Sequence, residues 1–145
     1  MRNNIFLYFL LAVFILVVAL LARVNQTTYS QVVIGETTFN IDVAESLEER
    51  SLGLSGRDFL DPGSGLLFIF PNEDFHGIWM KEMNFPIDII WLDKNYRVVG
   101  LKEGATPESY PEIFRPSLKA SYVLEINSGE AKKAKIKLKD IISFF

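Results

Sequence analysis

The sequence predicts a mainly β (α+β) protein, in which a small antiparallel sheet curls into a barrel or a sandwich with one or two short helices. An N-terminal transmembrane helix is predicted to precede this domain. Two observations support the fold class: short apolar runs separated by turn residues recur after residue 30, and an unbroken apolar run of 18 residues occupies 5–22. With 145 residues, the chain has room for one ordinary domain. We therefore divide it into an N-terminal segment at 1–23, a linker at 24–30 and a β domain at 31–145.

The apolar run at 5–22 is long enough to cross a membrane as a helix. At about 1.5 Å per residue it would extend roughly 27 Å, close to the roughly 30 Å of a hydrocarbon core. The alternatives are a cleaved signal peptide and a buried core helix, but Ala19 and Ala22 lack the small-x-small spacing of a cleavage site. Arg2 and the α-amine outnumber Arg23, which favours a cytoplasmic N-terminus and a domain outside the cytoplasm, periplasmic or extracellular. An anchor would make this a single-pass protein of the cell membrane, whereas cleavage would make it secreted.

Composition excludes several classes of function. The chain has no cysteine, which excludes disulfides, thiolate catalysis and iron–sulfur ligation. Because His76 is the single histidine, a zinc site would need carboxylates as its remaining ligands, and we expect no metal. Neither the dinucleotide fingerprint nor the phosphate-loop pattern occurs, and we expect no cofactor. Beyond residue 23 the net charge is −5, which makes the domain a poor candidate for binding nucleic acid.

The β domain opens with a predicted hairpin and a short helix. Gly35-Glu36 separates two β-branched segments at 31–34 and 37–43, and it supplies the positive φ that a tight turn needs. A helix is predicted over 45–54, because Ser46 stands three residues before Glu49 as in a capping box.

The remaining strands are predicted where apolar or β-branched segments end at turn residues, at 66–70, 77–83, 87–93, 96–101, 122–126 and 141–145. The run at 66–70 suits a strand buried on both faces. The segment at 104–119 has three prolines and no period, so we expect a long loop. In the lysine-rich segment at 132–139, alternation predicts that Ile136 and Leu138 point inward while the lysines protect an exposed edge. Attraction of these lysines to anionic lipid headgroups is the alternative.

A set of short motifs occurs in fixed order between residues 32 and 144: Arg50, Gly53-Leu54, Arg57, Leu60, Gly65-Leu66-Leu67-Phe68, Phe70-Pro71, Trp79-Met80-Lys81, Pro86-Ile87-Asp88-Ile89-Ile90, Tyr122-Val123-Leu124-Glu125, Gly129 and Asp140. This pattern resembles the uncharacterised family called domain of unknown function 192. The chain departs from the family pattern at Ser55 and Leu66, where methionine is usual, and at Glu82-Met83, where Asn-Thr is typical. The resemblance implies a small, mostly β domain that is often exported, and it implies no established activity.

Asp88 is an acidic residue inside the predicted strand at 87–93. Alternation places it on one apolar face of that strand, with a second apolar face opposite. An isolated buried carboxylate costs several kcal/mol unless a cation or several donors meet it. If the segment at 77–83 pairs with this strand, Lys81 would lie beside Asp88, and Arg57 is the other candidate partner.

The candidate site therefore consists of Arg57, Trp79, Lys81 and Asp88, with His76 at its rim. One interpretation is a buried ion pair that fixes strand register, with Trp79 filling the core. The other is a pocket in which Arg57 and Lys81 capture a small anionic ligand or an envelope component, while Trp79 offers a flat surface. His76 is either a loop residue or a general acid/base at the rim.

Two functions follow from this candidate site. The first is a membrane-tethered, extracytoplasmic β domain that binds a ligand or partner without covalent chemistry. The second is an envelope enzyme that uses Lys81, Asp88 and His76 for proton transfer. Placement distinguishes them, because an enzyme needs these groups together in a cleft, within about 3 to 3.5 Å of a reacting atom.

Overall fold

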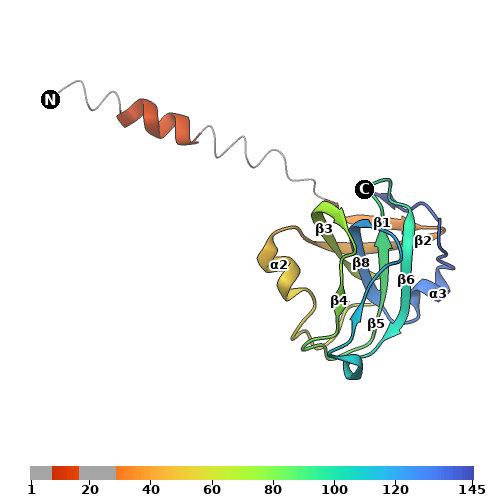
Figure 1. Ribbon diagram of the computed structural model, residues 1–145. Coiled ribbons are helices and arrows are strands. Elements are labelled where there is room, and N and C mark those ends of the chain that lie inside the picture. The colour runs from red at the N-terminus through yellow and green to blue at the C-terminus, as the bar shows by residue number, and fades with distance from the viewer. Residues whose placement is uncertain (1–7, 17–28) are drawn as a thin grey trace.

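The computed structural model describes residues 8–16 and 29–145, and most of its regular structure is β (Figure 1). Within the described domain the elements follow in this order: β1 Gln31–Ile34, β2 Thr37–Ala44, α2 Leu47–Leu52, β3 Ser64–Asp74, β4 Ile78–Trp79, β5 Ile87–Leu92, β6 Val98–Ala105, the 3-10 helix η1 Pro107–Ser109, β7 Ile113–Phe114, β8 Ala120–Asn127, α3 Glu130–Lys133 and β9 Ser143–Phe144. The predicted mainly β fold class, with short helices, is confirmed.

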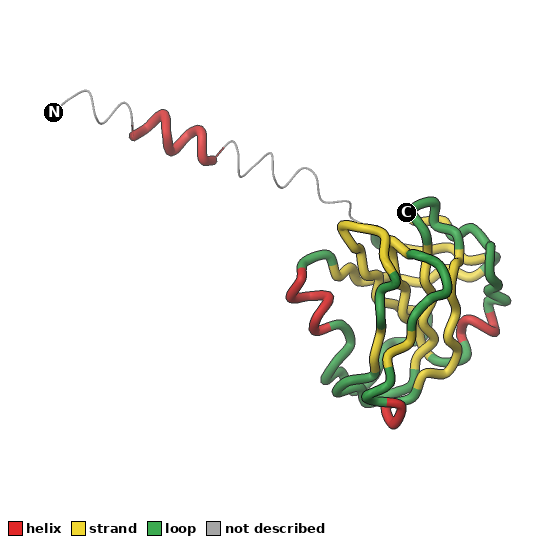
Figure 2. The backbone as a smooth tube through the Cα atoms, in the orientation of Figure 1, coloured by secondary structure: helices red, strands yellow, loops and turns green. Residues whose placement is uncertain are grey.

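Seven of these strands form one sheet in the order β6-β5-β8-β3-β2-β1-β9, and this sheet curls into a half-barrel (Figure 2). Strands β2 and β3 pair in parallel, so the sheet is mixed, and the prediction of an antiparallel sheet is wrong at this pair. A parallel pair needs a long crossover, which α2 and the segment after it provide. The start of β6 is joined to the segment just before β9, where the Val98 N–H donates to the Asp140 carbonyl at 2.8 Å.

An apolar core covers each face of the sheet. The inner core contains residues from both ends of the curled sheet: Val32, Ile34, Phe39, Ile41, Leu67, Ile90, Leu92, Val98, Leu124, Ile126, Ala131, Ile136 and Ile142. The outer core lies on the other face, beneath the segments that follow α2 and that contain β4 and β7: Ala44, Leu54, Leu60, Leu66, Phe68, Ile78, Met80, Met83, Ile87, Ile89, Trp91, Val99, Ala105, Ala120 and Val123. The alternation in β5 confirms the predicted strand with two apolar faces.

The opening hairpin and the first helix confirm the local sequence signals. Strands β1 and β2 pair through a turn at Gly35, whose φ of +60° is readily available to glycine. In α2 the Ser46 hydroxyl accepts from the Glu49 N–H at 3.1 Å, and the Glu49 carboxylate accepts from the Ser46 N–H at 2.8 Å. A reciprocal cap of this kind starts a helix that buries none of its own residues.

Strand β4 differs most from its prediction. It spans only Ile78–Trp79, within the predicted strand at 77–83, and it pairs with β7 and not with β5, the partner that would have brought Lys81 beside Asp88. Both sides of β5 are already occupied by β6 and β8, so no free edge is available to β4. The partner β7 lies inside the segment at 104–119, which was predicted to be loop throughout.

The lysine-rich segment is not an edge strand. Its first residues form α3, and turns follow, so the alternation predicted over 132–139 is wrong. Ile136 is buried as expected, but Leu138 is 57% exposed.

The predicted transmembrane span at 5–22 lies partly outside the described residues, as does most of the linker at 24–30. Residues 8–16 are helical and exposed. Among the residues that the structure describes, no helix is both long enough and apolar enough to cross a membrane.

Candidate functional site

Asp88 is fully buried in β5, on the face that contributes to the inner core. Its carboxylate accepts two backbone hydrogen bonds, from the Gly104 N–H at 2.8 Å and from the Ala131 N–H at 2.9 Å. The side chain therefore ties β6 and the beginning of α3 to β5. Two donors satisfy the carboxylate, and the predicted pairing with a cation is wrong.

Lys81 and Arg57 each pair with another carboxylate. The Lys81 ammonium lies 3.7 Å from Glu82, and the Arg57 guanidinium lies 3.1 Å from Asp42. Lys81 follows β4, which covers the outer face of the sheet, whereas Asp88 faces the inner core. The sheet itself separates the two residues that were predicted to pair.

His76 lies beside an aromatic ring of β3. Its imidazole stacks on Phe70 with 3.6 Å between ring centroids, and its Nε2 donates to the Asn72 carbonyl at 2.9 Å. Its own backbone carbonyl accepts from the indole N–H of Trp91 at 2.8 Å. The imidazole is thus a packed loop residue, and it does not contact Asp88.

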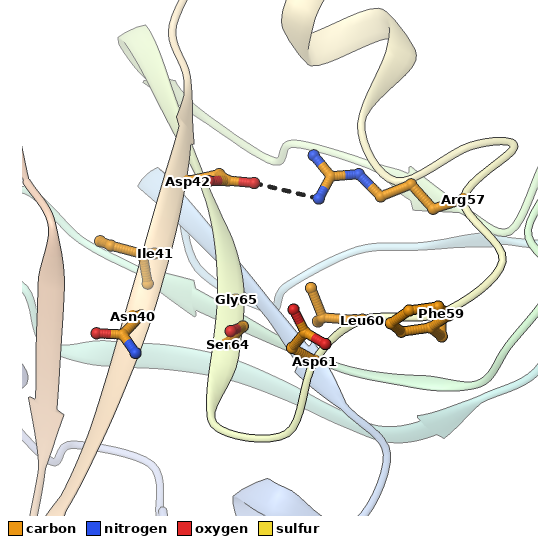
Figure 3. Close-up of a pocket in the computed structure, with 9 residues that line it drawn as sticks. All are labelled: Asn40, Ile41, Asp42, Arg57, Phe59, Leu60, Asp61, Ser64 and Gly65. Carbon is orange, nitrogen blue, oxygen red and sulfur yellow. Dashed lines mark hydrogen bonds and ion pairs between the residues drawn. The ribbon is translucent and has the colours of Figure 1, made fainter.

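Arg57 lines a pocket of about 210 Å³ between β2, β3 and the segment that follows α2 (Figure 3). The Asp42–Arg57 ion pair joins β2 to the segment after α2 on one side of this pocket, and Phe59, Leu60 and Asp61 line another side. Both charged side chains are substantially exposed, and an exposed pair of this kind needs no further partner. Trp79 and Lys81 do not line this pocket, so it does not combine them with Arg57 as predicted.

A second pocket, on the outer face, brings together groups that the sequence analysis did not combine. It measures about 70 Å³ and is lined by Arg50, Leu52, Gly53, Leu54, Ser55, Phe68, Gly77, Ile78, Trp79, Met83 and Glu125. We call it the Glu125 pocket. Trp79 is 48% exposed at its rim, whereas Glu125 is only 4% exposed.

Glu125 lies in β8, in the middle of the sheet, with Leu66 of β3 and Ile89 of β5 as its register partners. Those two neighbours belong to the outer core, so the Glu125 side chain projects from the same face. No side-chain hydrogen bond or ion pair joins it to any of the described residues. Burial raises the pKa of the Glu125 carboxyl to about 8, although the positive charge of Arg57 opposes this rise.

The sequence contained a signal for this residue. Alternation along the predicted strand at 122–126 puts Glu125 on the face of Val123, opposite Leu124 and Ile126. A carboxylate inside an apolar run, with no compensating pattern nearby, is the same signal that singled out Asp88. The missing information was the strand order, because only the central position of β8 shows that its second face is buried.

Comparison with known proteins agrees with this fold. The profile of the domain of unknown function 192 family, described as "Uncharacterized ACR", matches residues 30–144. The chain belongs to this family. Its curated relatives include UPF0127 protein PH1112 of Pyrococcus horikoshii, which is 34% identical over 110 residues, covering 72% of this chain and 87% of that protein.

Two crystal structures resemble this member of the domain of unknown function 192 family. A protein of unknown function from Novosphingobium aromaticivorans has a TM-score of 0.72 and 28% identity, covering 78% of this chain and 83% of that chain. A protein from Sinorhizobium meliloti has a TM-score of 0.73, covering 83% of this chain and 98% of that chain; at 23% identity it shows the fold alone. Function must therefore be argued from the site of this chain.

The Glu125 pocket offers this family member a binding chemistry of its own. Its floor carries an ionisable oxygen group without a partner among the described residues, and its rim carries an indole face. At about 70 Å³ the pocket exceeds the roughly 10–15 Å³ that one water molecule needs, and it suits a small head group. The geometry therefore fits recognition of one end of a ligand.

Proposed function

We propose that this protein is a membrane-tethered, extracytoplasmic domain that binds a ligand without covalent chemistry, and that the Glu125 pocket is its binding site. The observation that carries the proposal is a buried, unpartnered carboxyl at the floor of a pocket whose rim is a half-exposed tryptophan. A carboxyl in such a place is costly for folding alone, which favours a role in binding.

The tether in this proposal rests on the apolar run of 18 residues at 5–22. The seven residues at 24–30 could extend at most about 25 Å, which would hold the domain close to the bilayer. The distribution of Arg2 and Arg23 favours a domain outside the cytoplasm.

Binding is favoured over the alternative envelope enzyme because the proposed catalytic groups are separated. Asp88 faces the inner core, while Lys81 and His76 lie on the outer side of the sheet and contact other partners. Proton transfer between such groups needs direct contact or one bridging water.

Two measurements test this proposal. Protease added outside intact cells, after any outer membrane has been opened, should digest the domain, and complete protection would contradict the orientation. For binding, the full-length protein in nonionic detergent should be screened with small cationic, neutral and anionic fragments by ligand-observed NMR. At least one fragment should bind to the protein, and Trp79→Leu should weaken its binding. If no fragment shows this behaviour, the Glu125 pocket is not a binding site.

A further inference from the structure

We propose that the Glu125 pocket recognises an alkylammonium group, either a free small amine or a lysine side chain of a peptide. This inference rests on the proposed function and names its ligand class. The carboxylate of Glu125 would face the ammonium, and the apolar wall and Trp79 would cover the alkyl chain.

Glu125 has no counterion within ion-pair distance in the part of the chain that the structure describes. Glu125 is 4% exposed, and among the described residues its carboxyl has no hydrogen-bond donor and no ion-pair partner. The charge of Arg57 still acts on it, but the Arg57 guanidinium pairs with Asp42. Asp88, in the adjacent strand, shows how this fold satisfies a buried carboxylate when it is structural, with two backbone donors. Glu125 has no such donors and instead lines an open pocket. A positively charged ligand would supply what the fold omits.

Most of the side chains that line the pocket are apolar or aromatic. Trp79, Phe68 and Met83 line it, and indole is the best of the aromatic faces for attracting a cation. The ammonium of Lys81 already lies 5.9 Å from the centre of the Trp79 ring, so this ring accepts a cation on at least one side. An alkyl chain would lie against these side chains while its charged end approached the carboxyl.

The two arginines near Glu125 are bound to other groups. Arg50 of α2 lines the pocket, but its guanidinium is held by the carbonyls of Ile69, at 3.0 Å, and Glu45, and it lies 5.3 Å from the centre of the Phe70 ring. Arg57, after α2, pairs with Asp42. The flanking strands contribute only apolar side chains beside Glu125: Leu66 and Phe68 from β3, and Ile89 from β5.

These surroundings predict a distinctive pH dependence. Without a ligand, burial keeps the pKa of Glu125 near 8, so most of the carboxyl is protonated at pH 6. A cation binds the ionised form, so its binding releases a proton from Glu125. The amine itself stays protonated below about pH 10. Affinity should therefore rise about tenfold between pH 6 and pH 7 and level off above about pH 8.

The experiment titrates n-butylammonium into the full-length protein, reconstituted in nanodiscs of zwitterionic lipid. This lipid has no net charge, so the bilayer has no net attraction for the amine. n-Butanol is the neutral control of equal length, and propionate is the anionic one. A second arm uses a blocked Gly-Lys-Gly peptide. Binding is measured by isothermal titration calorimetry and by NMR shifts at pH 6, 7 and 8. If butylammonium binds more tightly than the peptide, the ligand is a free amine; if the peptide binds more tightly, it is a lysine side chain. Either result supports an alkylammonium ligand.

The variants separate recognition from folding. Glu125→Gln keeps the shape of the side chain but cannot ionise, and it should weaken butylammonium binding at pH 8 by about tenfold or more. Glu103→Gln removes an exposed carboxylate on β6 and should leave binding unchanged. Trp79→Leu should weaken binding about threefold or more, and it tests the pocket even if Glu125→Gln fails to fold.

Three results would overturn the alkylammonium ligand. These are butanol or propionate binding in the pocket as tightly as butylammonium, undiminished butylammonium binding by folded Glu125→Gln, or butylammonium affinity that does not rise with pH. If a neutral or anionic fragment still binds in a Trp79-dependent manner, the proposed binding function survives without this ligand class. If no fragment of any charge binds, both proposals fail.

Discussion

Two carboxylates on adjacent strands of one sheet have opposite surroundings. Asp88 of β5 faces the inner core and accepts hydrogen bonds from two backbone N–H groups. Glu125 of β8 faces the outer core, has no such partner among the described residues, and lines a pocket. Both side chains are buried, so burial alone does not tell a structural carboxylate from a binding one. The number of hydrogen-bond donors around the carboxylate distinguishes the two, because a carboxylate whose hydrogen bonds are satisfied within the fold gains little from a ligand.

The pH dependence of stability gives the largest expected contrast. Because burial raises the folded-state pKa of Glu125 to about 8, the folded protein retains a proton that the unfolded chain releases above its ordinary pKa of 4.5. Stability should therefore fall as pH rises from about 4.5 to about 8 and then level off. Glu125→Gln should remove this loss, which is on the order of 5 kcal/mol over that range.

Urea denaturation of the full-length protein at several pH values, with and without Glu125→Gln, measures this difference. Glu103→Gln is the matched control, since it removes an exposed carboxylate from the same domain. Parallel stability curves for the wild type and Glu125→Gln would mean that Glu125 is ionised and satisfied in the fold, and the contrast with Asp88 would disappear.

Replacement of Asp88 tests the other side of the comparison. Asp88→Asn keeps one acceptor but turns an amide N–H toward a backbone donor, leaving one of the Gly104 and Ala131 N–H groups unsatisfied. We expect a loss of about 2–3 kcal/mol in the free energy of unfolding at pH 7, with Glu103→Gln again as the control. A loss below about 0.5 kcal/mol would show that the two backbone donors do not depend on the carboxylate.

Glu49 supplies an exposed counterpart to Asp88. Its carboxylate also accepts from two backbone N–H groups, of Glu45 at 3.0 Å and of Ser46 at 2.8 Å, and these bonds lower its pKa. Its contribution to stability should be present above the ordinary pKa of 4.5 and be lost as pH falls below it. Glu49→Gln should cost a small fraction of what Asp88→Asn costs, because water replaces the lost bonds. If urea denaturation gives equal losses for Glu49→Gln and Asp88→Asn, burial of the carboxylate does not increase the contribution of its hydrogen bonds to stability.

The sequence predicted the local features of this fold better than its long-range ones. The Gly35 turn and the Ser46–Glu49 cap depend on neighbours within a few residues, and both are present. The two apolar faces around Asp88 followed from simple alternation. The pairing of β4 with β7 could not be predicted, because it depends on β6 and β8 already occupying both edges of β5.

The candidate site shows the same division between local and long-range information. Trp79 was predicted to line a pocket with Arg57 and Lys81, but it lines the Glu125 pocket instead. Glu125 carried the same pattern as Asp88 but was given no role. We predicted a cation beside Asp88, but the backbone N–H groups of Gly104 and Ala131 satisfy the Asp88 carboxylate instead. Both residues lie far from Asp88 in the sequence. A sequence pattern shows that a buried carboxylate needs a partner, but only the fold shows whether that partner is present.

The smallest expected effect concerns the pair that alternation and proximity first suggested. Lys81 pairs with Glu82 on the outer side, while Asp88 is enclosed in the inner core, so the two side chains share no partner. In a double-mutant cycle with Lys81→Met and Asp88→Asn, the losses should add, with a coupling energy below about 0.5 kcal/mol. Urea denaturation of the two single variants and the double variant measures this coupling. A coupling energy of about 2 kcal/mol would instead indicate an ion pair between Lys81 and Asp88. The two backbone donors would then not be sufficient to satisfy the Asp88 carboxylate.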